Sequence, residues 1–172
     1  MILCQWASAI GTTVIGTVST EEKAALARAN GCDHPILYTK QDFVERVREL
    51  TGGTGVPVVY DSVGKDTFLR SFDCLAPRGL MVSFGQSSGP VEPFAPGLLA
   101  QKGSLFLTRP TLFTYIADPT ELAASAAELF AIVASGKVKI AIRQRFALAD
   151  AAEAHRALEA RETTGSTVLT IG

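Results

Sequence analysis

Apolar residues recur along the chain with two periods that alternate from one segment to the next. Residues 1–10 place their apolar side chains on one face at the helical period, which predicts a helix. The β-branched run over 12–18 has instead the composition of a buried strand. After it, Ser19 or Thr20 can cap a second helix and Gly31 can end it. The chain is therefore predicted to begin as helix, strand and helix.

The same alternation continues to the end of the chain. Further helices are predicted over 41–51, 66–75, 119–135 and 150–161, and further strands over 34–38, 56–60, 79–84, 104–108, 139–148 and 167–171. Apolar strands separated by such helices are typical of βαβ crossovers, in which helices cover both faces of a parallel sheet. The predicted fold class is α/β, with a doubly wound, Rossmann-like parallel sheet. Near the C-terminus, residues 139–148 alternate polar and apolar side chains, unlike the apolar strands before them. This strand, the helix over 150–161 and the strand over 167–171 are expected to belong to another sheet.

The predicted first helix has no starting signal. No Ser, Thr, Asp or Pro precedes its apolar positions, so no side chain is available to cap its exposed backbone N–H groups. The glycine-rich turn that marks a dinucleotide site between a first strand and its helix is also absent. We therefore expect a doubly wound sheet that lacks its first strand and its glycine-rich turn, as in an N-terminally truncated domain.

Composition excludes several classes of protein. The chain has 172 residues, 47% hydrophobic and 19% charged, which is typical of one globular domain. Its net charge of −1 and its scattered Lys and Arg make nucleic acid an unlikely partner. No apolar stretch approaches the roughly 20 residues that cross a bilayer. Three widely spaced cysteines fit reduced thiols rather than disulfides or a metal site, so we expect a cytoplasmic protein without a metal.

The segment after the strand over 12–18 bears on cofactor choice. An NAD-binding fold usually has a carboxylate at the tip of this strand, whereas NADP requires a cation in place of that negative charge. This chain has no acid there, but it has the hydroxyls of Ser19 and Thr20 and the ammonium of Lys23 one turn into the helix. The pattern favours NADP. Simple helix capping with a solvated Lys23 explains the same residues and stays open.

Two later segments also follow predicted strands. Residues 61–64 form a small polar turn, and residues 84–89 combine Gly85, which permits close approach, with the polar side chains of Gln86 and Ser87. Each segment taken singly could be an ordinary turn, but ligands of open parallel sheets bind outside the carboxyl ends of strands. No Ser/His/Asp arrangement and no metal-ligand spacing is present, so no catalytic residue and no metal ligand are predicted.

Four segments together carry a family resemblance: 58–64, 71–75, 78–85 and 101–105. They resemble the zinc-independent quinone oxidoreductases, the NADPH-dependent quinone reductase and zeta-crystallin branch of the medium-chain dehydrogenase/reductase superfamily. The likeness extends over essentially all of the chain. It implies a nucleotide-binding Rossmann domain over 1–136 and a C-terminal segment of a GroES-like catalytic domain over 137–172. The rest of that catalytic domain and the glycine turn would precede Met1.

The resemblance also implies site residues. The grip on the cofactor 2′-phosphate falls on Lys23 and Tyr38, with Ser19 and Thr20 beside them. Contacts to nicotinamide and ribose fall on Val63, Gly85 and Ser87. The backbone at Phe113 and the side chain of Arg161 complete the implied set. In the family NADPH reduces a quinone or an enone by hydride transfer, without a metal and with no clear protein acid or base, so no catalytic residue is assigned.

The family is dimeric, and the strand between Ser104 and Thr108 resembles the edge strand that pairs with its twin in a homodimer. A plain sixth strand covered by Leu112 and Phe113 is the alternative interpretation. For the chain as given we expect weak NADPH binding at best and no normal quinone turnover. The alternative function is a non-catalytic dimerising or RNA-binding module, and a methyltransferase-type nucleotide fold would need an acid at the tip of the strand over 12–18, where none is present.

Overall fold

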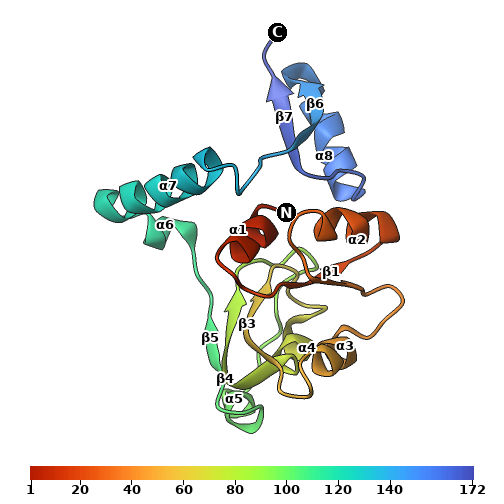
Figure 1. Ribbon diagram of the computed structural model, residues 1–172, viewed down its shortest axis with the longest axis vertical. Coiled ribbons are helices and arrows are strands. Elements are labelled where there is room, and N and C mark those ends of the chain that lie inside the picture. Colours follow the sequence, from red (N-terminus) through yellow and green to blue (C-terminus); the bar gives the residue numbers. More distant parts are fainter. The chain divides into compact units, whose positions relative to one another are not determined.

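The computed structural model describes residues 1–172 as an α/β protein in which helices and strands alternate (Figure 1). The helices are α1 (Ile2–Ala9), α2 (Glu21–Arg28), α3 (Phe43–Leu50), α4 (Phe68–Phe72), α5 (Gly97–Gln101), α6 (Leu112–Tyr115), α7 (Pro119–Ala134), the 3-10 turn η1 (Leu148–Asp150) and α8 (Ala151–Glu159). The strands are β1 (Ile15–Val18), β2 (His34–Leu37), β3 (Val56–Asp61), β4 (Leu75–Ser83), β5 (Phe106–Thr108), β6 (Ile142–Ala147) and β7 (Ser166–Thr170). None of the helices combines the length and apolar character needed to span a membrane.

Every predicted helix and strand is present, and α5, α6 and η1 are additional. The largest difference lies at the end of α4, because the sequence predicts a helix as far as Leu75. The helix ends at Phe72, and Val56 donates its backbone N–H to the Cys74 carbonyl at 2.8 Å. Pairing with β3 thus begins at this point and competes with further helical turns. As a result β4 starts at Leu75, before the strand predicted over 79–84.

The strands form three separate sheets: β1 with β2, β3 with β4 and β5, and β6 with β7. The β3–β4, β4–β5 and β6–β7 pairs are parallel. No backbone pairing joins these three sheets to one another. The separate C-terminal sheet is therefore confirmed, whereas the lack of a first strand stays a prediction.

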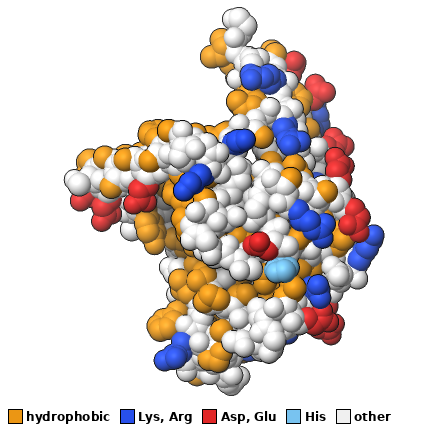
Figure 2. Space-filling view, in the orientation of Figure 1, with side chains coloured by type: hydrophobic (Ala, Val, Ile, Leu, Met, Phe, Trp, Pro, Cys, Tyr) orange, Lys and Arg blue, Asp and Glu red, His pale blue; other side chains and the backbone are white.

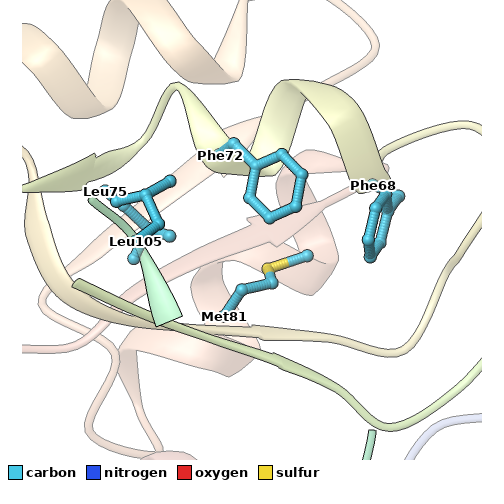
Figure 3. Packing of buried hydrophobic residues seen from close by; sticks show 5 residues of the cluster. All are labelled: Phe68, Phe72, Leu75, Met81 and Leu105. Carbon is cyan, nitrogen blue, oxygen red and sulfur yellow. The ribbon is translucent and has the colours of Figure 1, made fainter. Parts of the chain in front are cut away.

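The chain divides into two compact units. One consists of residues 1–14, 25–34 and 127–172, and the other of residues 15–24 and 35–126. The second unit contains the sheet β3-β4-β5 and its main core, which Figure 3 shows from close by. The buried side chains of this core are Phe68, Phe72, Leu75, Met81 and Leu105. They pack α4 against β4. This packing holds in place the ends of β3 and β4, from which two polar segments continue.

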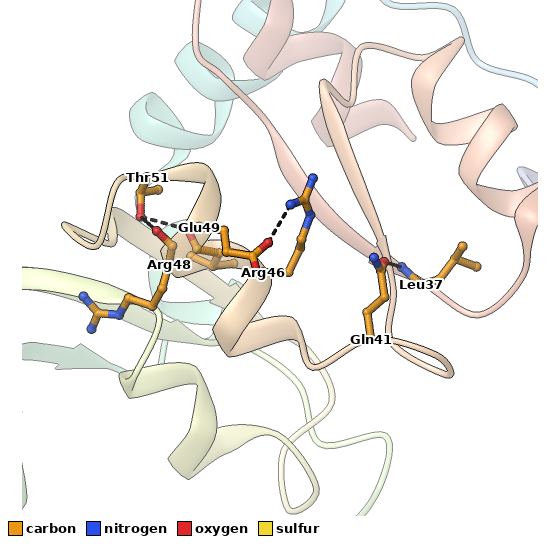
Figure 4. A network of polar contacts seen from close by, with 7 residues as sticks. Leu37, Gln41, Arg46, Arg48, Glu49 and Thr51 are labelled. Atoms are coloured by element: carbon orange, nitrogen blue, oxygen red, sulfur yellow. Dashed lines mark hydrogen bonds and ion pairs between the residues drawn. The ribbon is translucent and has the colours of Figure 1, made fainter.

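Helix α3 is attached to the same core by both its apolar and its polar side chains. Val47 is buried in a second cluster with Ile36 of β2 and Cys74. Arg48 donates from Nε to the carbonyl of Asp73 at 2.8 Å and from Nη1 to that of Gly53 at 2.7 Å. Figure 4 shows the polar contacts along this helix. The apolar cluster joins α3 to β2, and the bond from Arg48 to Asp73 joins α3 to the segment just before β4.

Candidate nucleotide-binding site

The carboxyl ends of β1 and β2 lie side by side. The backbone N–H of Tyr38 donates to the Val18 carbonyl at 3.2 Å, and the Thr39 hydroxyl donates to the Ser19 carbonyl at 3.1 Å. The exposed segment after β1 thus meets the segment after β2. Because Tyr38 directly follows β2 and is 43% exposed, its ring is accessible next to the residues that follow β1.

Thr20 caps the helix that follows β1. Its hydroxyl oxygen accepts a hydrogen bond from the backbone N–H of Lys23 at 3.2 Å. Lys23 therefore lies in the first turn of α2, on the same side of the strands as Tyr38. Glu21 and Glu22 share this turn, and Glu21 pairs with Lys40 at 3.6 Å. Thr20 therefore caps α2, as the sequence allowed. The same hydrogen bond holds the Lys23 backbone in the first turn of the helix.

A buried carboxylate organises the turn after β3. Asp61 is 4% exposed, and its Oδ1 accepts the backbone N–H groups of Val63 at 2.8 Å and Gly64 at 3.0 Å. Its Oδ2 accepts the hydroxyls of Thr67 at 2.7 Å and Ser71 at 2.8 Å. A buried carboxylate is stable only when its oxygens have such partners. Asp61 thus ties the end of β3, the turn and α4 into one rigid assembly.

The segment after β4 packs directly on that turn. Ser87 and Ser88 donate their backbone N–H groups to the carbonyls of Ser62 and Val63, at 3.2 and 2.8 Å. The Ser88 hydroxyl also donates to the Val63 carbonyl at 2.8 Å. At Gly85 a Cβ atom would lie only 2.5 Å from the Ser62 carbonyl oxygen, so this approach requires glycine. Val63, Gly85 and Ser87 are therefore neighbours at one edge of the sheet.

A cavity of about 480 Å³ opens beside this edge, within the range of small-molecule sites. The side chains that line it include Gln86, Pro90, Phe94, Leu107 and Arg109. Arg109, directly after β5, is a cation that the sequence reasoning did not single out. Ligands of parallel sheets bind at the carboxyl ends of strands, and this rule pointed to the segments after β3 and β4. Applied to β5, the same rule points to Arg109.

The structure brings seven of the nine implied residues into two groups. Ser19, Thr20, Lys23 and Tyr38 follow β1 and β2, while Val63, Gly85 and Ser87 follow β3 and β4. The other two are placed differently. Phe113 lies on α6 and is 82% exposed, and Arg161 follows α8, which belongs to the other compact unit. Their roles remain predictions from the family resemblance.

Strand ends that carry backbone N–H groups, hydroxyls and a lysine form a candidate ligand site of an α/β protein. Comparison with known proteins refines this class. Residues 30–169 match the model of the family described as zinc-binding dehydrogenase. The chain belongs to this family. The predicted α/β class and the resemblance to quinone oxidoreductases are both confirmed.

Individual relatives cover nearly the whole chain. It is 57% identical over 169 residues to the quinone oxidoreductase of Pseudomonas aeruginosa, and 48% identical to the 2-haloacrylate reductase of a Burkholderia species. Among solved structures, the Escherichia coli quinone oxidoreductase complexed with NADPH matches with a TM-score of 0.94 and 52% identity. Each match covers 98% of this chain but 51 to 52% of the relative. The chain thus spans about half the length of the relatives that it matches.

The residues present do not fit the zinc ion of the family's name. No three His, Cys, Asp or Glu side chains of the chain come together as a metal would require. His34 and His155 are both exposed, and Cys74 belongs to a different compact unit from Cys4 and Cys32. We therefore assign no step of any reaction to a metal.

Proposed function

We propose that this chain is the cofactor-binding part of an NADPH-dependent quinone oxidoreductase. Residues 1–136 would form the nucleotide-binding domain and residues 137–172 the C-terminal segment of the catalytic domain. The observation that carries the proposal is that Lys23, in the first turn after β1, and Tyr38, directly after β2, follow adjacent strand ends. Residues 18–20, at the tip of β1, include no carboxylate. The proposal is supported by a relative named quinone oxidoreductase and by a similar solved structure that is a complex with NADPH. Three cysteines present as thiols support a cytoplasmic location.

In this proposal each group of residues has one task. Lys23 pairs with the cofactor 2′-phosphate, while the hydroxyls of Ser19 and Thr20 and the ring of Tyr38 surround it. Val63, Gly85 and Ser87 hold the nicotinamide ribose in the rigid turn beside β3. Bound NADPH supplies a hydride. The chain's own part is to position the cofactor, and we assign no acid, base or zinc to it.

The substrate class follows from the cavity beside Gly85 and from the relatives. An electron-poor quinone or an activated alkene such as an enone accepts hydride without a metal. The likeness to a 2-haloacrylate reductase supports inclusion of the alkene. Phe94 and Leu107 supply apolar walls, and Arg109 supplies one cation that a substrate carbonyl oxygen can approach. In this proposal a substrate of this class lies against these side chains, next to Gly85.

The test is the replacement of Lys23 by alanine. Loss of a charge-assisted contact of about 1.5 to 3 kcal/mol should weaken NADPH binding roughly tenfold to a hundredfold, with NADH binding unchanged. The measurement is fluorescence titration of the chain with each nucleotide. Lys40→Ala is the matched control, because Lys40 follows β2 at the same edge and has no cofactor contact in this proposal. Equal losses for both nucleotides, or for both variants, would contradict the assignment.

We also propose a homodimer through the edge strand β5. This strand pairs with β4 on one side only, and Phe106 on it is 61% exposed. Hydrophobic side chains are also exposed over α6 and along α7 (Figure 2), among them Leu112 and Phe113. An unpaired, apolar strand edge is normally covered by another chain.

A charge at the β5 edge tests the homodimer. Phe106→Arg should shift the protein from dimer to monomer in sedimentation experiments, because two arginines would face each other across the two-fold axis. Leu158→Arg introduces the same charge at a similarly exposed apolar residue, on α8, and should leave the dimer intact. The interface would be excluded if the unaltered chain is a monomer, or if the Phe106→Arg variant is still a dimer.

A further inference from the structure

Two of the three cysteines meet within one compact unit. Cys4 lies on α1, and Cys32 precedes β2. Gly31, directly before Cys32, has a positive φ of 86°, and a Cβ atom there would lie 2.7 Å from Ser8 Cβ and 3.0 Å from the Cys4 carbonyl oxygen. Because Gly31 has no side chain, the segment before β2 lies directly against the Cys4–Ser8 face of the helix.

The two thiols differ in exposure and in acidity. Cys32 is 2% exposed, whereas Cys4 is only partly buried. A hydrogen bond between the two side chains lowers the pKa of the Cys4 thiol to about 6. Cys4 is therefore largely a thiolate near neutral pH. An accessible thiolate beside a second thiol is the arrangement of a cysteine pair that oxidises reversibly.

Cys74 shows the contrast within the same chain. It is 4% exposed in the core cluster with Ile36 and Val47, and burial raises the pKa of its thiol to about 11. It stays protonated at any physiological pH and belongs to the other compact unit. Cys74 is therefore a structural thiol and an internal reference for the reactivity of Cys4.

We propose that Cys4 and Cys32 form an intramolecular disulfide when a peroxide oxidises Cys4. The Cys4 thiolate attacks one peroxide oxygen, an S–O bond forms, the O–O bond breaks, and hydroxide leaves and takes up a proton. The Cys32 thiol then attacks the resulting sulfenic acid, an S–S bond forms, the S–O bond breaks, and water leaves with the thiol proton. The sulfur pair loses two electrons, and the peroxide is reduced by the same two.

The disulfide would close a loop that contains β1 and the turn with Ser19, Thr20 and Lys23. A covalent bond between residues so far apart in sequence restricts the unfolded chain and leaves the native contact in place. The oxidised protein should therefore unfold several degrees above the reduced protein, since a gain of this kind shifts Tm measurably in a domain of this size. This inference does not depend on the proposed quinone chemistry.

The test is treatment of the folded chain with hydrogen peroxide, followed by alkylation in denaturant and peptide mapping. We expect a cross-link between the peptides that contain Cys4 and Cys32, a mass lower by a pair of hydrogen atoms, and alkylation of Cys74 alone. Oxidation should be faster above pH 6 than below it, because the Cys4 thiolate is the nucleophile. The groups that act on the Cys4 thiol are the Cys32 side chain and the positive charge of the Met1 amino group.

Serine variants provide the controls. Cys4→Ser and Cys32→Ser should each abolish the cross-link and the rise in Tm, whereas Cys74→Ser should keep both. Peptide mapping of the unaltered chain gives an answer even if a variant folds poorly. Three alkylated thiols after peroxide treatment, a stable sulfenic acid at Cys4, or a disulfide between two chains would each overturn the proposal.

Discussion

Replacing Asp61 with alanine is expected to lower the free energy of unfolding by about 3 to 5 kcal/mol. The substitution removes the acceptor for the backbone N–H groups of Val63 and Gly64 and for the hydroxyls of Thr67 and Ser71. These donors stay buried or half-buried, and each one left unpaired costs about 1 to 3 kcal/mol, reduced where water enters. Urea denaturation monitored by circular dichroism measures the loss.

Asp73→Ala is the matched control for this prediction. The partner of Asp73 is Lys102, but the Asp73 side chain is 39% exposed and the pair lies at the surface. Exposed ion pairs contribute about 0 to 1 kcal/mol, so the control should lose little stability. Asp61→Asn should fall between the two variants, because its carbonyl oxygen can still accept from one pair of donors. Similar losses for Asp61→Ala and Asp73→Ala would mean that Asp61 does not organise the turn.

The sequence was sufficient for those parts of the site that follow from local rules. The absence of an acid after β1, the cap at Thr20 and the lysine one turn later are neighbours in the chain, so their placement needs only helix geometry. Gly85 was also accessible to sequence reasoning, because the carboxyl end of β4 had to reach the same sheet edge as that of β3.

Other features depend on contacts that no local pattern encodes. The sequence gives no sign that Asp61 accepts from Ser71, because the side-chain direction of α4 depends on how Phe68 and Phe72 pack. The end of α4 before Cys74 was missed for a similar reason, since strand pairing with Val56 decides it. The approach of Cys4 to Cys32 rests on Gly31, which as a sequence feature indicated only the end of a helix.

Gly64→Ala is the second substitution with a large expected effect. Gly64 has a φ of 88°, and a Cβ atom there would lie 2.7 Å from the Gly89 carbonyl oxygen and 2.9 Å from Gln86 Cα. Both neighbours are backbone atoms and cannot turn away. Left-handed backbone in alanine costs about 1 to 2 kcal/mol, and overpacking adds about 1 to 3 kcal/mol. We therefore expect a loss of about 3 kcal/mol in urea denaturation.

Gly53→Ala separates the two contributions to that loss. Its φ of 83° is nearly the same, but no atom lies within 4 Å of the position that its Cβ would take. The control should therefore lose only the backbone strain, about 1 to 2 kcal/mol. The two variants should also differ in nucleotide binding, because displacement of Gln86 moves the segment that holds Gly85 and Ser87. If both variants lose equal stability and Gly64→Ala keeps its affinity for NADPH, the contact between the turns after β3 and β4 has no role in shaping the site.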